Sequence, residues 1–303
     1  MINRWRAGRF EIDLSRPRVM GIVNATPDSF AGDTGAGTAR SRLELVDRHL
    51  ADGADLIDIG GESTRPGAPA VSADVELARI LPVLRPAVRL GVPVSVDTRK
   101  VAVMRAALAE GADIINDVQA LQAAGAEELL AEQSDTGICL MHMRGDPESM
   151  QQQACYDDVV HEVVGFLQMR VAALVARGVA RERIVLDPGF GFAKTAEHNL
   201  SLHRRQSELL SLGLPLLVGW SRKSTLGTIT GRPARERVAA SVAAALASVV
   251  NGASIVRVHD VAATVDALKV WRTFGMSQSM THGIADDMTP GTNPQPMGNQ
   301  QKP

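Results

Sequence analysis

Short apolar segments alternate with longer segments of helical periodicity along most of the chain. The apolar segments are rich in β-branched residues and lack strict alternation, which is typical of strands buried on both faces of a sheet. They are Val19–Val23, Leu56–Ile59, Val92–Val96, Ile114–Ile115, Ile138–Met141, Ile184–Leu186, Leu214–Val218 and Ile255–Val258. Helices are expected at Arg40–Ala51, Val75–Leu90, Val101–Glu110, Val159–Arg177 and Arg237–Val250. The pattern therefore predicts about eight units of strand and helix.

A repeated joint supports this unit. Gly53, Gly111 and Gly252 each stand where a predicted helix ends and a strand follows almost at once, and glycine commonly ends a helix in the left-handed conformation. Repeated units of this kind form either a closed barrel or a doubly wound sheet. No Gly-x-Gly-x-x-Gly motif follows the first strand. The sequence therefore favours an α/β fold of the (β/α)8 TIM barrel type.

The ends of the chain differ from the barrel pattern, which covers residues 18–275. Phe10–Leu14 alternates between apolar and polar residues. We therefore expect residues 1–17 to form a short N-terminal β cap over the bottom of the barrel. After Gly275 the composition shifts to Ser, Thr, Gly, Pro, Asn and Gln, which predicts a disordered tail over residues 276–303.

Composition limits the classes of function. A chain of 303 residues with 45% apolar and 22% charged residues can form one large barrel domain. Its net charge of −2 gives no indication of a nucleic-acid or anionic-membrane partner. No signal peptide or membrane-length apolar run is expected. Cys139 and Cys155 are too few for a disulfide framework and fit a reducing, cytoplasmic setting.

Polar residues follow nearly every predicted strand, at the barrel end where enzymes of this fold keep their active sites. Asp97, Asn116 and Asp187 offer carboxylates and an amide, which suit a flat heterocycle with N–H donors and ring-nitrogen acceptors. Lys223 adds a donor. Taken singly, Asp97 could be only a helix cap and Asp187 only a turn residue. Together, we expect them to converge on one site.

A second group of strand-end residues suits an anion. Asn24, Arg65, Arg257 and His259 offer cations and hydrogen-bond donors for phosphate oxygens. A Walker A loop and a zinc-binding pattern are both absent from the sequence. Asn24 could contact a Mg²⁺ ion that also holds phosphate oxygens, which is the usual mode for that ion.

Seven segments, in order over roughly residues 18–275, carry a family resemblance. Met20–Phe30 resembles the first signature of the bacterial-type dihydropteroate synthases, and Asp58–Gly67 resembles the second. The further matches are Ser95–Thr98, Ile115–Asp117, Leu186–Lys194, Ser221–Ser224 and Arg257–Val261. The resemblance implies an enzyme of folate biosynthesis that condenses 6-hydroxymethyl-7,8-dihydropterin diphosphate with p-aminobenzoate, a homodimer and a target of sulfonamides.

The resemblance also implies a role for each site residue. The pterin would be held by Asp97, Asn116, Asp187 and Lys223. The diphosphate would be held by Asn24, Arg65, Arg257 and His259, with Mg²⁺ at Asn24. The p-aminobenzoate site would comprise Phe30, Thr64, Pro66, Phe192 and Ser224. Catalysis would involve Asp33, Asp97 and Lys223.

One loop departs from the family pattern. The family reads Asp-Ser-Phe-Ser-Asp-Gly-Gly after the first signature, whereas this chain reads Asp-Ser-Phe-Ala-Gly-Asp-Thr-Gly over residues 28–35. The loop acid, Asp33, is thus displaced by one place. Two alternatives stay open: a non-catalytic paralogue with an altered loop, and a methyltetrahydrofolate–corrinoid methyltransferase on the same barrel. The methyltransferase would not need the Ser-Thr-Arg-Pro-Gly or Ser-Arg-Lys-Ser segments, because it handles no diphosphate.

Overall fold

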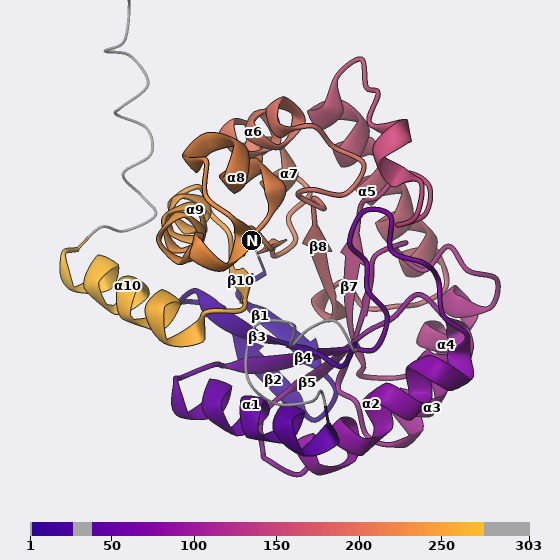
Figure 1. Cartoon of the computed structure of the whole chain (residues 1–303). Coiled ribbons are helices and arrows are strands. Elements are labelled where there is room, and N and C mark those ends of the chain that lie inside the picture. Colours follow the sequence, from indigo (N-terminus) through magenta and orange to yellow (C-terminus); the bar gives the residue numbers. More distant parts are fainter. Residues whose placement is uncertain (1, 27–37, 276–303) are drawn as a thin grey trace, which may run out of the picture.

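The computed structural model describes residues 2–26 and 38–275. In that part of the chain, eight parallel strands form one curved sheet inside a ring of helices (Figure 1). The strands run in the order β8-β7-β6-β5-β4-β3-β10-β9. Their bounds are β3 Arg18–Asn24, β4 Leu56–Gly60, β5 Val94–Asp97, β6 Ile114–Asp117, β7 Gly137–Met141, β8 Ile184–Asp187, β9 Leu217–Val218 and β10 Ile255–Val258.

Helices connect each strand of this sheet to the next along the chain, and α10 follows β10. They are α1 Ala39–Ala51, α2 Ala73–Ala87, α3 Val101–Ala109, α4 Ala126–Glu132, α5 Val159–Ala176, α6 Ala196–Arg204, α7 Gln206–Leu210, α8 Ser224–Thr230, α9 Val238–Val250 and α10 Val261–Thr273. Short 3-10 helices lie at Met150–Gln153, Arg181–Arg183 and Ala234–Glu236. The predicted joints are confirmed, since Gly53, Gly111 and Gly252 have φ of +92°, +94° and +96°.

The sheet nearly closes on itself between its two outer strands. Leu186 of β8 forms an isolated parallel bridge with Leu216, which precedes β9. The backbone N–H of Leu186 donates to the carbonyl of Pro215 at 3.0 Å. The prediction of a (β/α)8 barrel is therefore confirmed.

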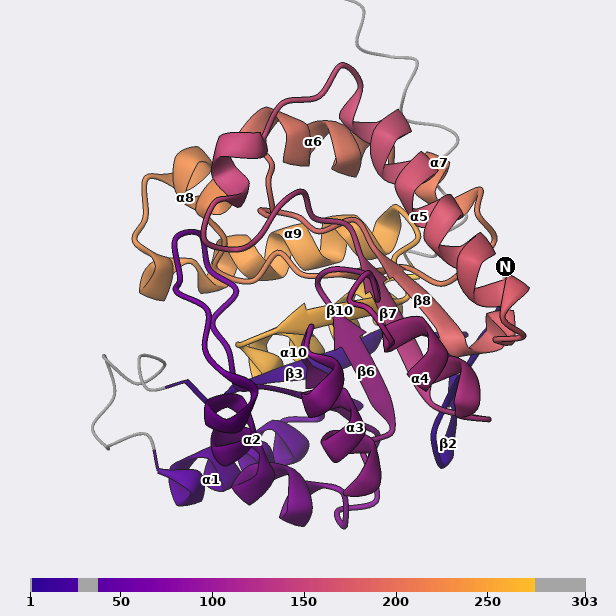
Figure 2. The same ribbon diagram turned by 90° about the vertical axis from the view of Figure 1, so that its right-hand side faces the viewer.

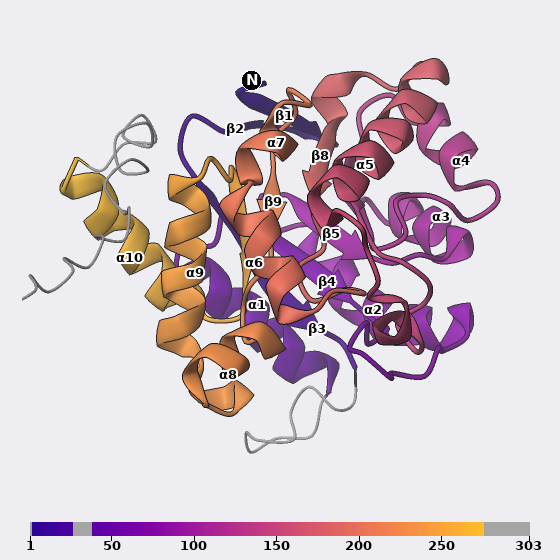
Figure 3. The same cartoon turned by 90° about the horizontal axis from the view of Figure 1, so that it is seen from above.

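A β-hairpin covers one end of the barrel. Its strands are β1, Arg4–Ala7, and β2, Phe10–Asp13, which pair antiparallel. The sequence pattern indicated the second strand but not the first. Figures 2 and 3 both show this hairpin at the end of the barrel opposite α8. Trp5 is fully buried there, and its indole N–H donates to the carbonyl of Arg183 at 2.9 Å.

The barrel interior has an apolar layer at the capped end and a polar layer at the other. Side chains that point inward recur at every second residue along a strand. The apolar layer packs against the hairpin and comprises Met20, Leu56, Ile114, Cys139, Val185, Leu217 and Ile255. Two residues further along four of these strands stand Asp58, Asn116, Asp187 and Arg257. The hairpin therefore covers the apolar end of the barrel, and the polar end is left as the candidate site for ligands.

Of the described helices, α5 alone is long and apolar enough to cross a membrane by length and composition, with a mean hydropathy of 1.5 over 18 residues. Its buried residues lie on one face, which is typical of a helix packed on a protein core. Arg170, in the middle of α5, donates to the carbonyls of Ala120 and Leu121 at 2.8 and 3.1 Å. We therefore interpret α5 as a helix of the barrel.

The cap predicts a measurable stability effect. Trp5→Ala should lower the free energy of unfolding by about 3–5 kcal/mol, because it removes a fully buried ring and its hydrogen bond. Trp5→Phe should cost less, since much of the apolar contact remains. Urea denaturation followed by circular dichroism measures both, with Val75→Ala on the exposed face of α2 as the control. A Trp5→Ala protein as stable as the control would show that the cap adds no stability.

Candidate active site

Residues from five strands meet in the polar layer of the barrel. Arg257 of β10 lies at their centre, and its guanidinium donates to Asp97 at the end of β5 at 2.9 Å. A second bond runs from Arg257 to Asp58 of β4 at 2.6 Å. Asn116 of β6 and Asp187 at the end of β8 are both buried. The structure thus brings predicted residues of the heterocycle group together with one from the anion group.

Asp58 is a site residue that the sequence analysis used only as part of a motif. Its side chain is fully buried. One oxygen receives Arg257 and also the amide of Asn116, at 3.4 Å. The other oxygen has no hydrogen-bond partner in the described part of the chain. The signal in the sequence was an acid two residues after Leu56, on the same side of a strand that is otherwise apolar.

Lys223 reaches the site from the loop after β9. Its ammonium donates to the carbonyl of Phe190 and lies 4.6 Å from the ring centroid of Phe192. Arg222, just before it, has a left-handed φ of +60°, which is costly for a residue with a side chain. An ion pair of 2.6 Å between Arg222 and Asp260 anchors that turn. The loop is therefore built to direct Lys223 inward.

Burial shifts the pKa values of the titratable groups in this centre toward neutral pH. Burial raises the pKa of Asp97 to about 7; the Arg257 guanidinium opposes the shift and the neighbouring Asp58 adds to it. Burial also raises the pKa of Asp187, although Lys223 pulls it down. Conversely, burial lowers the pKa of Lys223 to about 8, against the attraction of Asp187. An acid and a base whose pKa values lie near 7 are expected where proton-dependent binding or catalysis occurs.

The residues predicted for an anion lie at the same end of the barrel. Asn24 ends β3 and pairs with Gly60 of β4. His259 follows β10, and burial lowers its pKa to about 3, helped by nearby arginines. Ser221 accepts from the backbone N–H of His259 at 3.1 Å and lies 2.9 Å from its Nδ1. The Ser221 hydroxyl can thus donate to Nδ1, which leaves the Nε2–H of a neutral imidazole as a donor.

The residues predicted for p-aminobenzoate are divided between loops. Thr64 and Pro66 lie in the loop after β4, where Thr64 is half-buried and Pro66 is exposed. Phe192 lies in the loop after β8, and Ser224 begins α8. The Lys223–Phe192 contact joins Phe192 to the polar centre. By contrast, the loop of Thr64 and Pro66 is bonded to the loops after β5 and β7. Phe30 and Asp33 lie outside the described residues, as does the predicted tail.

Comparison with known proteins identifies the class to which this fold and site belong. The family model described as "Pterin binding enzyme" matches residues 20–259. A dihydropteroate synthase of Neisseria meningitidis serogroup B is 56% identical over 279 residues, which is 90% of this chain and 98% of that protein. The chain therefore belongs to the pterin-binding enzymes. Within that family it belongs to the dihydropteroate synthases, which are transferases.

Solved structures agree with this membership. The dihydropteroate synthase of Xanthomonas albilineans with 4-aminobenzoic acid has a TM-score of 0.84 and 47% identity, covering 91% of this chain and 99% of that one. The Yersinia pestis enzyme in a sulfonamide drug complex has a TM-score of 0.85 and 45% identity, covering 90% and 100%. Both likenesses cover at least 90% of this chain.

Asp97 and Lys223 are the residues expected from the sequence to hold the pterin, and their pKa values then predict a pH optimum for its binding. Below the pKa of Asp97, about 7, the carboxylate gains a proton and loses an acceptor for ring N–H groups. Above the pKa of Lys223, about 8, the ammonium loses a donor. Affinity measured by calorimetry should therefore be greatest between these values and fall by up to about tenfold per pH unit outside them.

Two variants separate the acidic and alkaline limbs of this dependence of pterin affinity on pH. Asp97→Asn should remove the acidic limb, and Lys223→Gln should remove the alkaline limb, each with weaker binding overall. An affinity that stays constant across the range would contradict the assignment of these two groups to the pterin.

Proposed function

We propose that the chain joins 6-hydroxymethyl-7,8-dihydropterin diphosphate to p-aminobenzoate, giving 7,8-dihydropteroate and diphosphate for folate biosynthesis. The observation that carries the proposal is the buried polar layer, in which Asp97, Asn116 and Asp187 lie around the cation of Arg257. These acceptors and the amide can fix a pterin ring in one orientation, and Lys223 can donate to it. The relatives bound to 4-aminobenzoic acid and to a sulfonamide support the second substrate.

The proposed reaction is a displacement at the methylene carbon of the pterin. The C–O bond to diphosphate breaks first and the bonding electrons leave with the oxygen. The amine nitrogen of p-aminobenzoate then attacks the cationic methylene and loses a proton. Arg65, Arg257 and the Nε2–H of His259 would stabilise the negative charge that grows on diphosphate. The carboxylates of Asp97 and Asp187 would stabilise the positive charge on the ring.

Arg257 would serve both halves of the pterin substrate. Its guanidinium lies between Asp58 and Asp97, where the ring would bind. It also stands two residues before His259, which directly follows β10. Its position would therefore join the ring site to the anion site.

Mg²⁺ is proposed as a partner of the diphosphate. In the described ranges, no group of three or more His, Cys, Asp or Glu residues could hold a metal ion by itself. The amide oxygen of Asn24 is a hard donor that fits an ion held mainly by phosphate oxygens and water. When bound, the ion would neutralise charge on the leaving group.

The loop after β3 is proposed to complete the site. Asp33 would act as an acid of this loop and Phe30 would border the arylamine, with Thr64, Pro66, Phe192 and Ser224. Sulfonamides would compete with p-aminobenzoate for the same pocket.

We also propose a homodimer in the cytoplasm. An apolar groove of about 340 Å³ lies between α9 and α10, bordered by Leu246, Val250, Val270, Trp271 and Phe274. Phe274 is 75% exposed and Val270 51% exposed. Contact with a second copy would remove this apolar surface from water. Cys139 and Cys155 are both free thiols, as expected in a reducing compartment.

Release of diphosphate tests the reaction directly. The purified protein with pterin diphosphate and Mg²⁺ should release diphosphate only when p-aminobenzoate is added, as measured by a pyrophosphatase-coupled phosphate assay. Asp187→Asn should abolish most of the rate and lower pterin affinity at least tenfold, because a buried ring donor loses its acceptor. A wild-type protein that binds pterin but releases no diphosphate would be the non-catalytic paralogue.

The anion site is tested separately. Arg65→Ala should weaken binding of pterin diphosphate and of free diphosphate by about tenfold, because one exposed cation is lost. Binding of 6-hydroxymethylpterin, which lacks phosphates, should stay the same. If calorimetry shows that both pterins bind more weakly by the same factor, Arg65 does not act on the anion.

A further inference from the structure

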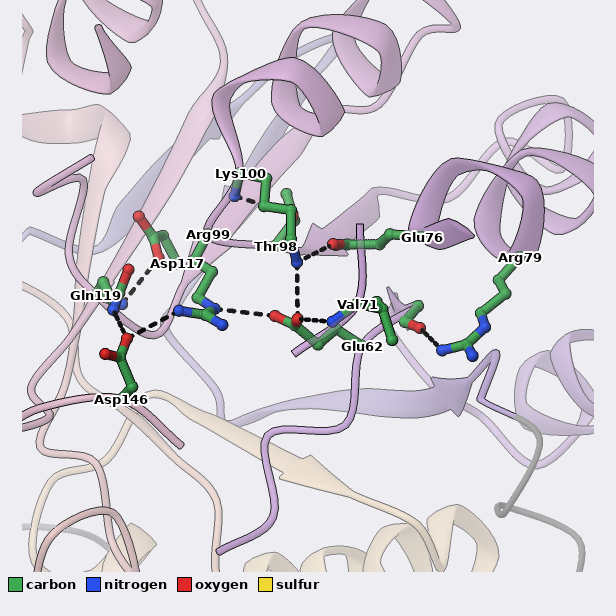
Figure 4. A network of polar contacts seen from close by, with 11 residues as sticks. Glu62, Val71, Glu76, Arg79, Thr98, Arg99, Lys100, Asp117, Gln119 and Asp146 are labelled. Carbon is green, nitrogen blue, oxygen red and sulfur yellow. Dashed lines mark hydrogen bonds and ion pairs between the residues drawn. The ribbon is translucent and has the colours of Figure 1, made fainter. Parts of the chain in front are cut away.

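A network of charged and polar side chains joins the loops after β4, β5, β6 and β7 (Figure 4). At its centre is Glu62, whose side chain is 5% exposed. One oxygen of Glu62 receives Arg99 at 2.9 Å. The other receives Lys100 at 2.8 Å and the backbone N–H of Val71 at 3.0 Å. Glu62 stands at the start of the loop that carries Thr64 and Pro66, and its bond to Val71 ties the end of that loop to its start.

Two cations balance the buried acid charge of this network. Lys100 bridges Glu62 and the fully buried Glu76, the latter at 2.7 Å. Burial by itself would raise the pKa of Glu62, but Arg99 and Lys100 outweigh it and the pKa is lowered. Glu62 is thus held as a carboxylate whose two oxygens both accept hydrogen bonds, so its side chain is fixed in one position.

Arg99 connects Glu62 to a second loop of the site. Its Nε binds Glu62, and its Nη1 donates to Asp146, in the loop after β7, at 2.9 Å. A further bond joins the same two loops, since the backbone N–H of Gly67 donates to the carbonyl of Pro147 at 3.0 Å. Gln119, from the loop after β6, also donates to Asp146 at 2.9 Å. Arg99 therefore joins two loops: its Nε is bonded to the loop after β4, and its Nη1 is bonded to the loop after β7.

We propose that Arg99 is a positioning residue for the arylamine side of the site, because it fixes the loop of Thr64 and Pro66 against the loop after β7. This inference rests on the proposed function, which gives these two residues to p-aminobenzoate. Among the described residues, no hydrogen bond or ion pair joins Arg99 to the pterin group, in which Asp97 bonds to Arg257 and Asn116 bonds to Asp58. Its loss should therefore affect one substrate and leave the other unchanged.

Kinetics of Arg99→Met and Arg99→Lys test the proposal. Arg99→Met should raise the KM for p-aminobenzoate and the inhibition constant of a sulfonamide by about tenfold, with kcat changed less than about threefold. Arg99→Lys should be intermediate, because an ammonium cannot reproduce the two-armed geometry of the guanidinium. Pterin affinity by calorimetry should equal that of the wild type. Arg85→Met is the matched control, since Arg85 forms an ion pair with Glu110 and is well exposed.

Hydrogen exchange gives a readout that does not depend on activity. The amides of Gly67 and Val71 should exchange faster in Arg99→Met than in Arg85→Met, because their acceptors are held by the network. An unchanged KM with unchanged exchange would overturn the proposal. Equal losses of pterin and arylamine binding would also overturn it, since Arg99 would then support the whole barrel. A wild-type protein without diphosphate release would refute the proposed function, whereas exchange and sulfonamide binding would still decide the role of Arg99.

Discussion

The polar end of the barrel depends on one buried cation. Arg257 lies between Asp58 and Asp97, both of which would otherwise be uncompensated charges inside the protein. Removing one partner from such a group leaves a buried charge that costs several kcal/mol, on the order of 3–5. The same cation limits the upward pKa shift of Asp97. A carboxylate that can accept hydrogen bonds near neutral pH therefore depends on the arginine beside it.

The apolar end of the barrel makes this charged centre possible. The hairpin places Trp5 and Ile12 against the inward-facing residues at the start of the strands, so water is excluded from below. Four of the strands then turn from apolar to polar within two residues, as from Val185 to Asp187. The acids are held on rigid strands at one depth, which suits a flat ring better than flexible loops would. Fold stability and ligand geometry are thus provided by successive layers of the same strands.

The loops above this layer are held by a different set of charges. Glu62 and Arg99 bind each other and their surroundings without contacting the group around Arg257. In the proposed reaction the strand-borne layer holds the pterin, and the loops place the arylamine. Two substrates would therefore depend on two separate networks, which allows one to be altered with little effect on the other.

The sequence by itself determined the eight strands, the barrel, and the strand-end positions of Asp97, Asn116 and Asp187, because period and motif spacing are local properties of the chain. It did not reveal β1, whose four residues are too few to show a pattern, or the role of Asp58. The pairing of Arg257 with Asp58, 199 positions apart, also required the structure. The bond from Arg99 to Asp146 spans 47 positions and two loops. Such contacts are decided only by closure of the barrel, because the curvature of the sheet brings strands distant in sequence to one mouth.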